Sequence, residues 1–211
     1  MKVNSADTND LLGQAQAGDQ KALGELFSRY CDRLRQMVQL RLDRHLQGRI
    51  DPSDVLQETY LDVSRRLGEY GRNPSVSFFL WLRFLTGQKL IDLHRHHLGV
   101  KMRDAGQEVS LYRGAFPQAS SISLAAQLLG RLTSASRAAI RAETQIRVQE
   151  ALNSMDAMDR EVLTLRHFEM LSNEETAQVL GISKTAASNR YVRALKRLKG
   201  ILTTVAGWEK P

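Results

Sequence analysis

The chain has 211 residues, 30 basic and 23 acidic, so its formal net charge is +7. Hydrophobic residues make up 42 %, which is enough for a buried core and excludes a wholly disordered chain. The single cysteine, Cys31, excludes an internal disulfide and a thiolate zinc cluster and is typical of a reducing cytoplasm. The longest purely apolar run is residues 78–82, far short of the roughly 20 that span a bilayer, so we expect no membrane segment.

The first part of the chain has the periodicity of helices. Over residues 9–46 apolar side chains recur at helical spacing, namely Leu23, Leu26, Phe27, Tyr30 and Leu34. A second helix is predicted to begin at Asp51-Pro52, because Asp51 can cap free amides and Pro52 needs no donor in the first turn. Its apolar stripe is Leu56, Tyr60, Val63 and Leu67. Residues 68–74 are predicted to form a turn, and residues 76–97 a third helix.

The composition changes at Gly99. Glycine, proline and paired serines without periodicity are typical of a linker, which we predict over 99–133 with a short helix at 124–132 inside it. Helical patterning resumes near Ser134. The sequence therefore predicts an all-α chain with a helical domain at 9–98, a linker at 99–133 and a second helical domain at 134–204.

The sharpest local pattern lies in the second domain, after a helix predicted at 159–169. Ser172 and Glu175 form a capping box that starts a two-turn helix, and Gly181 ends it with left-handed geometry. Ser183 then caps a helix over 184–201. Two helices joined by a turn with glycine form the arrangement that reads DNA in the major groove.

The second of these helices is basic. Between positions 184 and 199 it has no acidic residue, and its six basic residues are Lys184, Arg190, Arg193, Lys196, Arg197 and Lys199. Its buried stripe is predicted to be Ala187, Tyr191, Leu195 and Leu198. The alternative is a solvated helix of a bundle, but such helices usually mix charges of both signs.

Two features of the first domain point beyond DNA binding by that helix. Asp54, Glu58 and Asp62 lie along one helical face, and such an acidic face suits either solvent or a protein partner. The apolar side chains of residues 78–85 point in every direction around the helix, and we assign Phe79 and Leu82 to the core. Phe78 and Trp81 are candidates for exposure, where aromatic rings can stack on unpaired bases.

The order of these parts resembles the bacterial extracytoplasmic-function (ECF) sigma factors. The resemblance rests on DPSDVLQETYLDVSRRL, FFLWLRFLTGQKLIDLHRHH and MDREVLTLRHFEMLSNEETAQVLGISKTAASNRYVRALKRLKGIL, and covers about residues 20–98 and 140–202. It implies a region 2 helical bundle joined by the linker to a region 4 helix-turn-helix. Ala186-Ala187 departs from the family, which often has a branched apolar residue there.

The resemblance also implies roles for particular residues. Docking on the β′ clamp of core RNA polymerase would fall to Asp54, Gln57, Glu58 and Asp62, and the β subunit is a further expected partner. Recognition and melting of the minus-ten element would fall to Asn73, Ser75, Phe78, Trp81, Lys89 and Arg95. Recognition of the minus-thirty-five element would fall to Lys184, Thr185, Ser188, Asn189, Arg190, Arg193, Lys196 and Arg197.

The function implied is that of a non-enzymatic initiation subunit in the bacterial cytoplasm, which binds core polymerase and both double-stranded and melted promoter DNA. An anti-sigma protein is a further partner class, and no cofactor is expected. A free-standing helix-turn-helix regulator is the alternative. A nuclease or recombinase would need paired metal carboxylates or a nucleophile, and Tyr191 falls on the buried stripe. His94, His96 and His97 lack the carboxylate or cysteine that would complete a metal site.

Overall fold

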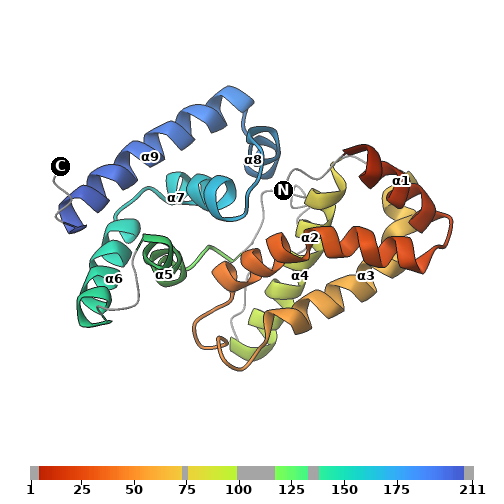
Figure 1. Ribbon diagram of the computed structural model, residues 1–211, viewed down its shortest axis with the longest axis horizontal. Helices are drawn as coiled ribbons and strands as arrows, with labels where there is room; N and C mark the ends of the chain where they lie inside the picture. The colour runs from red at the N-terminus through yellow and green to blue at the C-terminus, as the bar shows by residue number, and fades with distance from the viewer. Residues whose placement is uncertain (1–4, 73–75, 99–116, 133–137, 207–211) are drawn as a thin grey trace. The chain divides into compact units, whose positions relative to one another are not determined.

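The computed structural model describes residues 5–72, 76–98, 117–132 and 138–206, and within these ranges the regular structure consists of α-helices and one π-helical turn (Figure 1). The chain divides into two compact units. The first contains α1, α2 up to Gln39, α3 and α4. The second contains residues 40–44 together with α5 to α9. The all-α, two-domain prediction is confirmed.

The first unit begins with two helices where the periodicity indicated one continuous region. α1 (Ser5–Gln16) and α2 (Gln20–Arg41) are separated by a turn in which Gly18 has a φ of +102°, a value that favours glycine. Asp19 caps α2, because its Oδ1 accepts a hydrogen bond of 2.8 Å from the amide of Lys21. The residues predicted at helical spacing, Leu23 to Leu34, form the buried face of α2.

α3 (Pro52–Arg72) begins where the sequence predicts but ends later. The predicted turn at 68–74 is wrong for residues 68–72, which continue the helix. Tyr70 accounts for the extension. Its ring is buried, and its hydroxyl donates a 2.9 Å hydrogen bond to the carbonyl of Val76, just before α4 (Phe78–Leu98).

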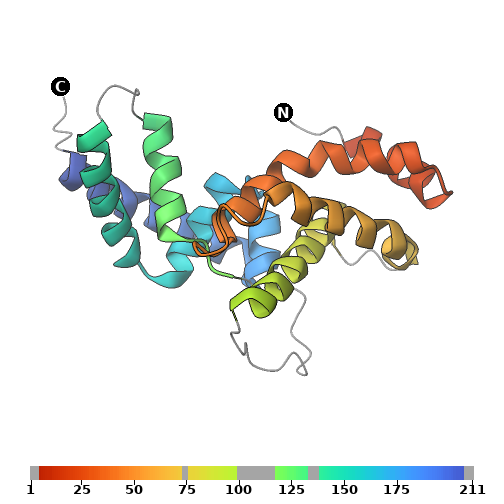
Figure 2. The same cartoon turned by 90° about the horizontal axis from the view of Figure 1, so that it is seen from below.

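α4 packs along α3 (Figure 2). Its apolar residues contribute to the buried core. Phe79 and Leu82 are buried, as predicted. Phe78 is buried too, with only 5 % of its surface exposed, so its predicted exposure is wrong. Rings from two other helices cover it: Tyr70 of α3 lies 5.5 Å away between ring centroids and Tyr30 of α2 lies 6.1 Å away.

The second unit is built from α5 (Ser121–Leu132), α6 (Ala138–Asn153), α7 (Ala157–Leu163), the π-helical turn η1 (Thr164–Phe168), α8 (Asn173–Leu180) and α9 (Lys184–Ala206). α5 falls inside the predicted linker and lies beside α6 (Figure 2). Its Leu124 and Leu128 join Val148 and Leu152 of α6 in a single buried core. The short helix predicted inside the linker is therefore a packed element of this unit.

Residues 40–44, at the end of α2 and just after it, belong to the second unit. Leu40 enters its core, and the buried Arg41 guanidinium binds Glu169, with 2.7 Å from Nε to Oε1, and also Glu161. Burial opposes the charge of Arg41, but the two carboxylates outweigh it and raise the pKa of Arg41. The guanidinium therefore stays charged inside the core.

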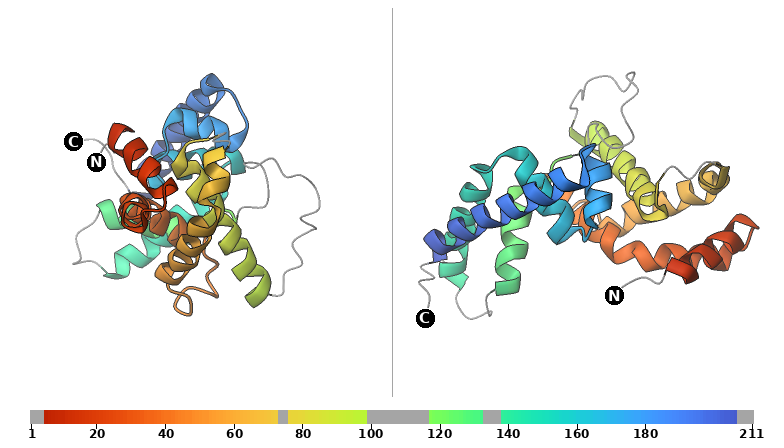
Figure 3. Two further views of the ribbon diagram at one scale, coloured as in Figure 1. Left: turned by 90° about the vertical axis from the view of Figure 1, so that its right-hand side faces the viewer. Right: turned by 90° about the horizontal axis from the view of Figure 1, so that it is seen from above.

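α9 runs across α6, α7 and α8 (Figure 3). Ala187, Ala194 and Leu198 form its buried stripe, with Tyr191 partly buried beside them. The prediction that Leu195 belongs to this stripe is wrong, since 36 % of its surface is exposed. Seven residues make about two turns, so Ala194 follows Ala187 on one line, while Leu195 lies about 100° further around.

Candidate nucleic-acid and protein interfaces

The helix-turn-helix is held by local capping contacts. Ser172 Oγ accepts a 3.1 Å hydrogen bond from the amide of Glu175, and Glu175 accepts one of 2.7 Å from the amide of Ser172. Gly181 ends α8 with a φ of +61°, and Ser183 Oγ accepts from the amide of Ala186 at the start of α9. The predicted capping box, glycine turn and serine cap are confirmed.

A hydrogen bond also fixes α9 on α8. The side-chain amide of Asn173 donates to the carbonyl of Lys184 over 2.9 Å, joining the first turns of the two helices. Lys184 Nζ pairs with Glu174 at 2.9 Å, although both side chains are 61 % exposed. The start of α9 is thus positioned by its backbone, which leaves the side chains there free of the core.

The first turns of α9 present a polar surface to solvent. The exposed side chains there, which we call the reading face, are Lys184, Thr185, Ser188 and Asn189. Val192, one turn further on, is also exposed, at 48 %. Hydroxyl, amide and ammonium groups can bond to base edges in a major groove, and a small apolar group can contact a thymine methyl. Sequence reasoning missed Val192, although it is an apolar residue among polar ones.

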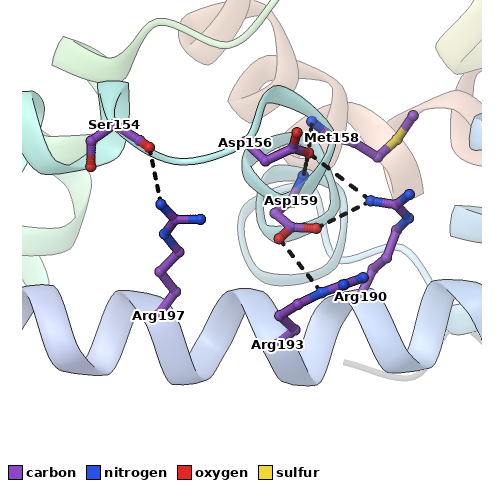
Figure 4. A network of polar contacts seen from close by, with 7 residues as sticks. All are labelled: Ser154, Asp156, Met158, Asp159, Arg190, Arg193 and Arg197. Carbon is purple, nitrogen blue, oxygen red and sulfur yellow. Dashed lines mark hydrogen bonds and ion pairs between the residues drawn. The ribbon is translucent and has the colours of Figure 1, made fainter.

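Three predicted DNA-binding arginines form a second line on α9, which we call the arginine row: Arg190, Arg193 and Arg197. All three point toward residues 154–159, before and within α7 (Figure 4). Arg190 Nη1 lies 3.4 Å from Oδ1 of Asp159, and Arg193 Nε lies 3.7 Å from Oδ2 of the same residue. Arg197 donates to the carbonyl of Ser154 over 3.3 Å. Lys196 is exposed as well.

The predicted acidic face lies on α3. Asp54, Gln57 and Glu58 are exposed. Asp51 caps the helix through a 2.7 Å hydrogen bond from the amide of Ser53, and this bond lowers the pKa of its carboxyl group. Asp62 differs from the other acids, because it is only 27 % exposed and pairs with Lys89 of α4 over 2.8 Å.

A groove of about 500 Å³ lies beside this acidic face. It is lined by Phe27, Cys31, Arg35, Ser53, Leu56, Gln57, Tyr60 and Leu61. Leu61 is 52 % exposed, and burial raises the pKa of the Cys31 thiol, which keeps it protonated. Sequence reasoning missed this groove because it forms only when α2 and α3 pack. The apolar Leu61 among polar positions of α3 was its one local sign.

The structure describes four of the six residues predicted for the minus-ten element, and these four lie in different surroundings. Asn73 and Ser75 lie outside the described residues. Trp81 is partly buried and stacks on Tyr70 with ring centroids 4.9 Å apart, and Phe78 lies beneath at 5.7 Å. Lys89 is tied to Asp62, whereas Arg95 lies 3.9 Å from Asp92 on the surface of α4.

Nowhere in the described part of the chain do three or more histidine, cysteine, aspartate or glutamate side chains gather as a metal site. Among the described helices, none combines the length and apolar character needed to cross a membrane.

Known proteins resemble both units. The family model described as "Sigma-70, region 4" matches residues 145–198, from α6 to α9. The RNA polymerase sigma factor CnrH of Cupriavidus metallidurans is 29 % identical over 211 residues, covering 95 % of this chain and 97 % of CnrH. The ECF RNA polymerase sigma factor SigD of Mycobacterium tuberculosis is 28 % identical, covering 94 % of this chain and 85 % of SigD.

A solved structure agrees with these relatives. The structure of CnrH in complex with the cytosolic domain of CnrY superposes with a TM-score of 0.56 at 25 % identity, covering 94 % of this chain and 98 % of CnrH. Similarity therefore extends over both units and does not stop at the helix-turn-helix, as it would for a free-standing regulator. The sequence and structure comparisons together support an ECF RNA polymerase sigma factor that acts in transcription initiation.

Proposed function

We propose that this sigma factor binds core RNA polymerase through α3 and places it on promoters through α9, in the bacterial cytoplasm. One observation carries the DNA-binding half of the proposal. The reading face is exposed on a helix without acidic residues between 184 and 199, and that helix is fixed in a capped helix-turn-helix. A helix of this kind can enter the major groove with its first turns at the base edges.

The reading face would contact the minus-thirty-five element. Lys184, Thr185, Ser188 and Asn189 offer groups that bond to bases, and Val192 extends this surface toward a thymine methyl. Lys196 is placed for a phosphate contact. The arginine row is proposed to lie nearer the DNA backbone than the bases, because its members already contact residues 154–159.

Docking on the β′ clamp is assigned to Asp54, Gln57 and Glu58. The groove beside them supports this, since an apolar side chain of a partner could enter it while the acidic residues bind basic ones. Asp62 would contribute mainly by orienting α3 against α4. The β subunit is proposed as a contact of the second unit. CnrH bound to the cytosolic domain of CnrY supports a regulatory protein partner of the anti-sigma class.

Region 2 is proposed to occupy residues 9–98 and region 4 residues 134–204, with 99–133 as the linker that carries α5. In region 2, Trp81 and Arg95 are proposed to meet the melted minus-ten strand, with Asn73 and Ser75 as polar contacts before α4. The role of the protein in this scheme is binding and positioning, with the chemistry of RNA synthesis supplied by core polymerase.

Reconstitution tests the proposal directly. The purified chain is mixed with bacterial core RNA polymerase, and run-off transcription is measured on a library of genomic fragments. We expect co-elution with core polymerase and transcripts that start at a shared promoter pattern. Absence of both would contradict the proposal, and promoter binding without core polymerase would point to the free-standing regulator instead.

The assignment of Asp54, Gln57 and Glu58 to docking can be tested with two matched variants of α3. Glu58→Lys should weaken co-elution with core polymerase, since an acidic contact becomes repulsive toward a basic surface. Glu69→Lys makes the same charge change about three turns further along α3 and should leave co-elution unchanged. Equal behaviour of the two variants would contradict the docking assignment.

A further inference from the structure

Two members of the arginine row, Arg190 and Arg193, are held by an acidic residue that no sequence pattern singles out. Asp159 lies in the first turn of α7, and its side chain is only 6 % exposed. Its two carboxylate oxygens face two different residues of α9, Oδ1 toward Arg190 and Oδ2 toward Arg193 (Figure 4). One buried carboxylate thus spans two arginines that are separated by a single helical turn.

Neighbouring groups strengthen this arrangement. Asp156 caps α7 by accepting hydrogen bonds from the amides of Met158 and Asp159, at 3.0 and 3.2 Å. The same Asp156 oxygen lies 4.0 Å from Arg190 Nη1. The backbone at the start of α7 is therefore fixed, and the Asp159 carboxylate has a defined position. A buried carboxylate needs such partners, because losing them leaves an uncompensated charge.

The two arginines differ in how firmly they are held. The side chain of Arg190 is 35 % exposed and lies near both aspartates, whereas that of Arg193 is 61 % exposed and meets only one oxygen at 3.7 Å. Asp159 therefore holds Arg190 more firmly than Arg193.

We propose that Asp159 determines the specificity of promoter recognition by holding Arg190 and Arg193 away from DNA phosphates. Phosphate contacts raise affinity for any sequence, and they contribute most where base contacts do not fix the orientation of the protein on DNA. A carboxylate that competes for these arginines therefore lowers non-specific binding more than specific binding. Sequence is then read by the reading face, which is not part of the ion pairs of Asp159. The inference deepens the proposed function and rests on it.

The test uses holoenzyme made from core polymerase and the full-length chain. Its probes are a promoter fragment recovered by run-off transcription and the same fragment with its minus-thirty-five element replaced. Asp159→Asn keeps the shape and removes the charge. We expect it to lower the ratio of the two affinities about threefold to tenfold, because two partly exposed ion pairs each shift an equilibrium by roughly 1.5- to 5-fold. The salt dependence of log K should steepen by about one per arginine released.

Three variants separate specificity from general damage. Asp159→Glu keeps the charge, so its ratio of affinities for the two fragments should stay close to the wild-type ratio. Glu150→Gln removes an exposed acid from α6 and should change neither the ratio nor the salt slope. In an Arg190→Ala, Arg193→Ala background, Asp159→Asn should no longer steepen the salt slope, because no arginine is left to release.

Failure of the proposed function and failure of the role given to Asp159 produce different results in these experiments. If wild-type holoenzyme does not initiate at any promoter, the proposed function fails. If it does, and Asp159→Asn leaves both ratio and slope unchanged in a folded protein, only the inference is overturned. Should a thermal melt show that Asp159→Asn is unfolded, Arg193→Ala decides instead. If Arg193→Ala and wild-type holoenzyme have the same salt slope, Arg193 does not contact phosphate and the role of Asp159 is supported. A slope reduced by about one would show that Arg193 binds a phosphate, which overturns the inference.

Discussion

Met170 occupies a backbone position that suits glycine. It follows the π-helical turn η1, has a φ of +60°, and its side chain is 61 % exposed. The left-handed conformation costs an L-residue roughly 1–2 kcal/mol, while glycine adopts it freely at the expense of about 0.5–1 kcal/mol of unfolded-state entropy.

Met170→Gly should therefore raise the free energy of unfolding by up to about 1 kcal/mol, because the relieved strain exceeds the added chain entropy. Chemical denaturation measures this change. Met170→Ala is the matched control, since alanine keeps the Cβ atom and with it the strain. A glycine variant no more stable than the alanine variant would contradict the account.

Trp81 is the aromatic residue best placed for the melted strand. It is partly buried, with one ring face stacked on Tyr70. Trp81→Ala should reduce transcription from duplex promoters while a template with a pre-melted bubble stays active, because stacking of one base contributes about 1–3 kcal/mol. Trp81→Phe should retain much of the activity.

Thermal melts and co-elution with core polymerase control for misfolding, since loss of a tryptophan from a core costs about 3–5 kcal/mol. Equal loss on duplex and bubble templates in a folded variant would assign Trp81 to packing alone.

At the scale of elements, one ion pair joins α3 to α4. Asp62 and Lys89 are 27 % and 23 % exposed and meet at 2.8 Å, so each partly screens the other from solvent. A double-mutant cycle with Asp62→Asn and Lys89→Met should give a coupling energy of about 1 kcal/mol in the unfolding free energy. Coupling near zero would leave Lys89 available for DNA, as the sequence alone suggested.

Local signals in the sequence predicted elements well. The capping box at Ser172, the left-handed Gly181 and the Asp51-Pro52 helix start each depend on residues within one turn, and all are confirmed. Such features need no knowledge of the rest of the fold, because the same few residues supply both the hydrogen-bond donor and its acceptor.

Contacts between elements were harder to predict. The first two turns of α4 carry apolar side chains in every direction, so a helical wheel could not tell that Tyr70 and Tyr30 cover Phe78. For the same reason the arginine row gave no sign of its partner, since Asp159 lies 31 residues from Arg190 in sequence. Long-range packing decided both cases.

At the scale of the whole molecule, distant parts of the chain complete the second unit. Arg41 lies more than a hundred residues before Glu161 and Glu169, yet its side chain is 1 % exposed, as is that of Glu169. Arg41→Ala should lower the free energy of unfolding of this unit by about 3–5 kcal/mol, because the buried carboxylate of Glu169 would lose the guanidinium that compensates its charge.

Scanning calorimetry of the full chain measures that loss. Arg44→Ala, which removes an exposed arginine three residues away, should change stability by less than about 0.5 kcal/mol. A comparable effect of the two substitutions would contradict a role for the buried pair.

The positions of α9 that face solvent and those that hold the fold together are different residues, so promoter preference can change between related proteins while the fold is kept. Thr185, Ser188 and Asn189 are exposed, whereas Ala187 and Ala194 are fully buried. Mutations that alter the DNA sequence preferred by the protein can therefore accumulate at the first set without eroding the fold. A gene library randomised at those three codons should yield mostly folded proteins with many new preferences, while one randomised at the alanine codons should yield mostly insoluble protein.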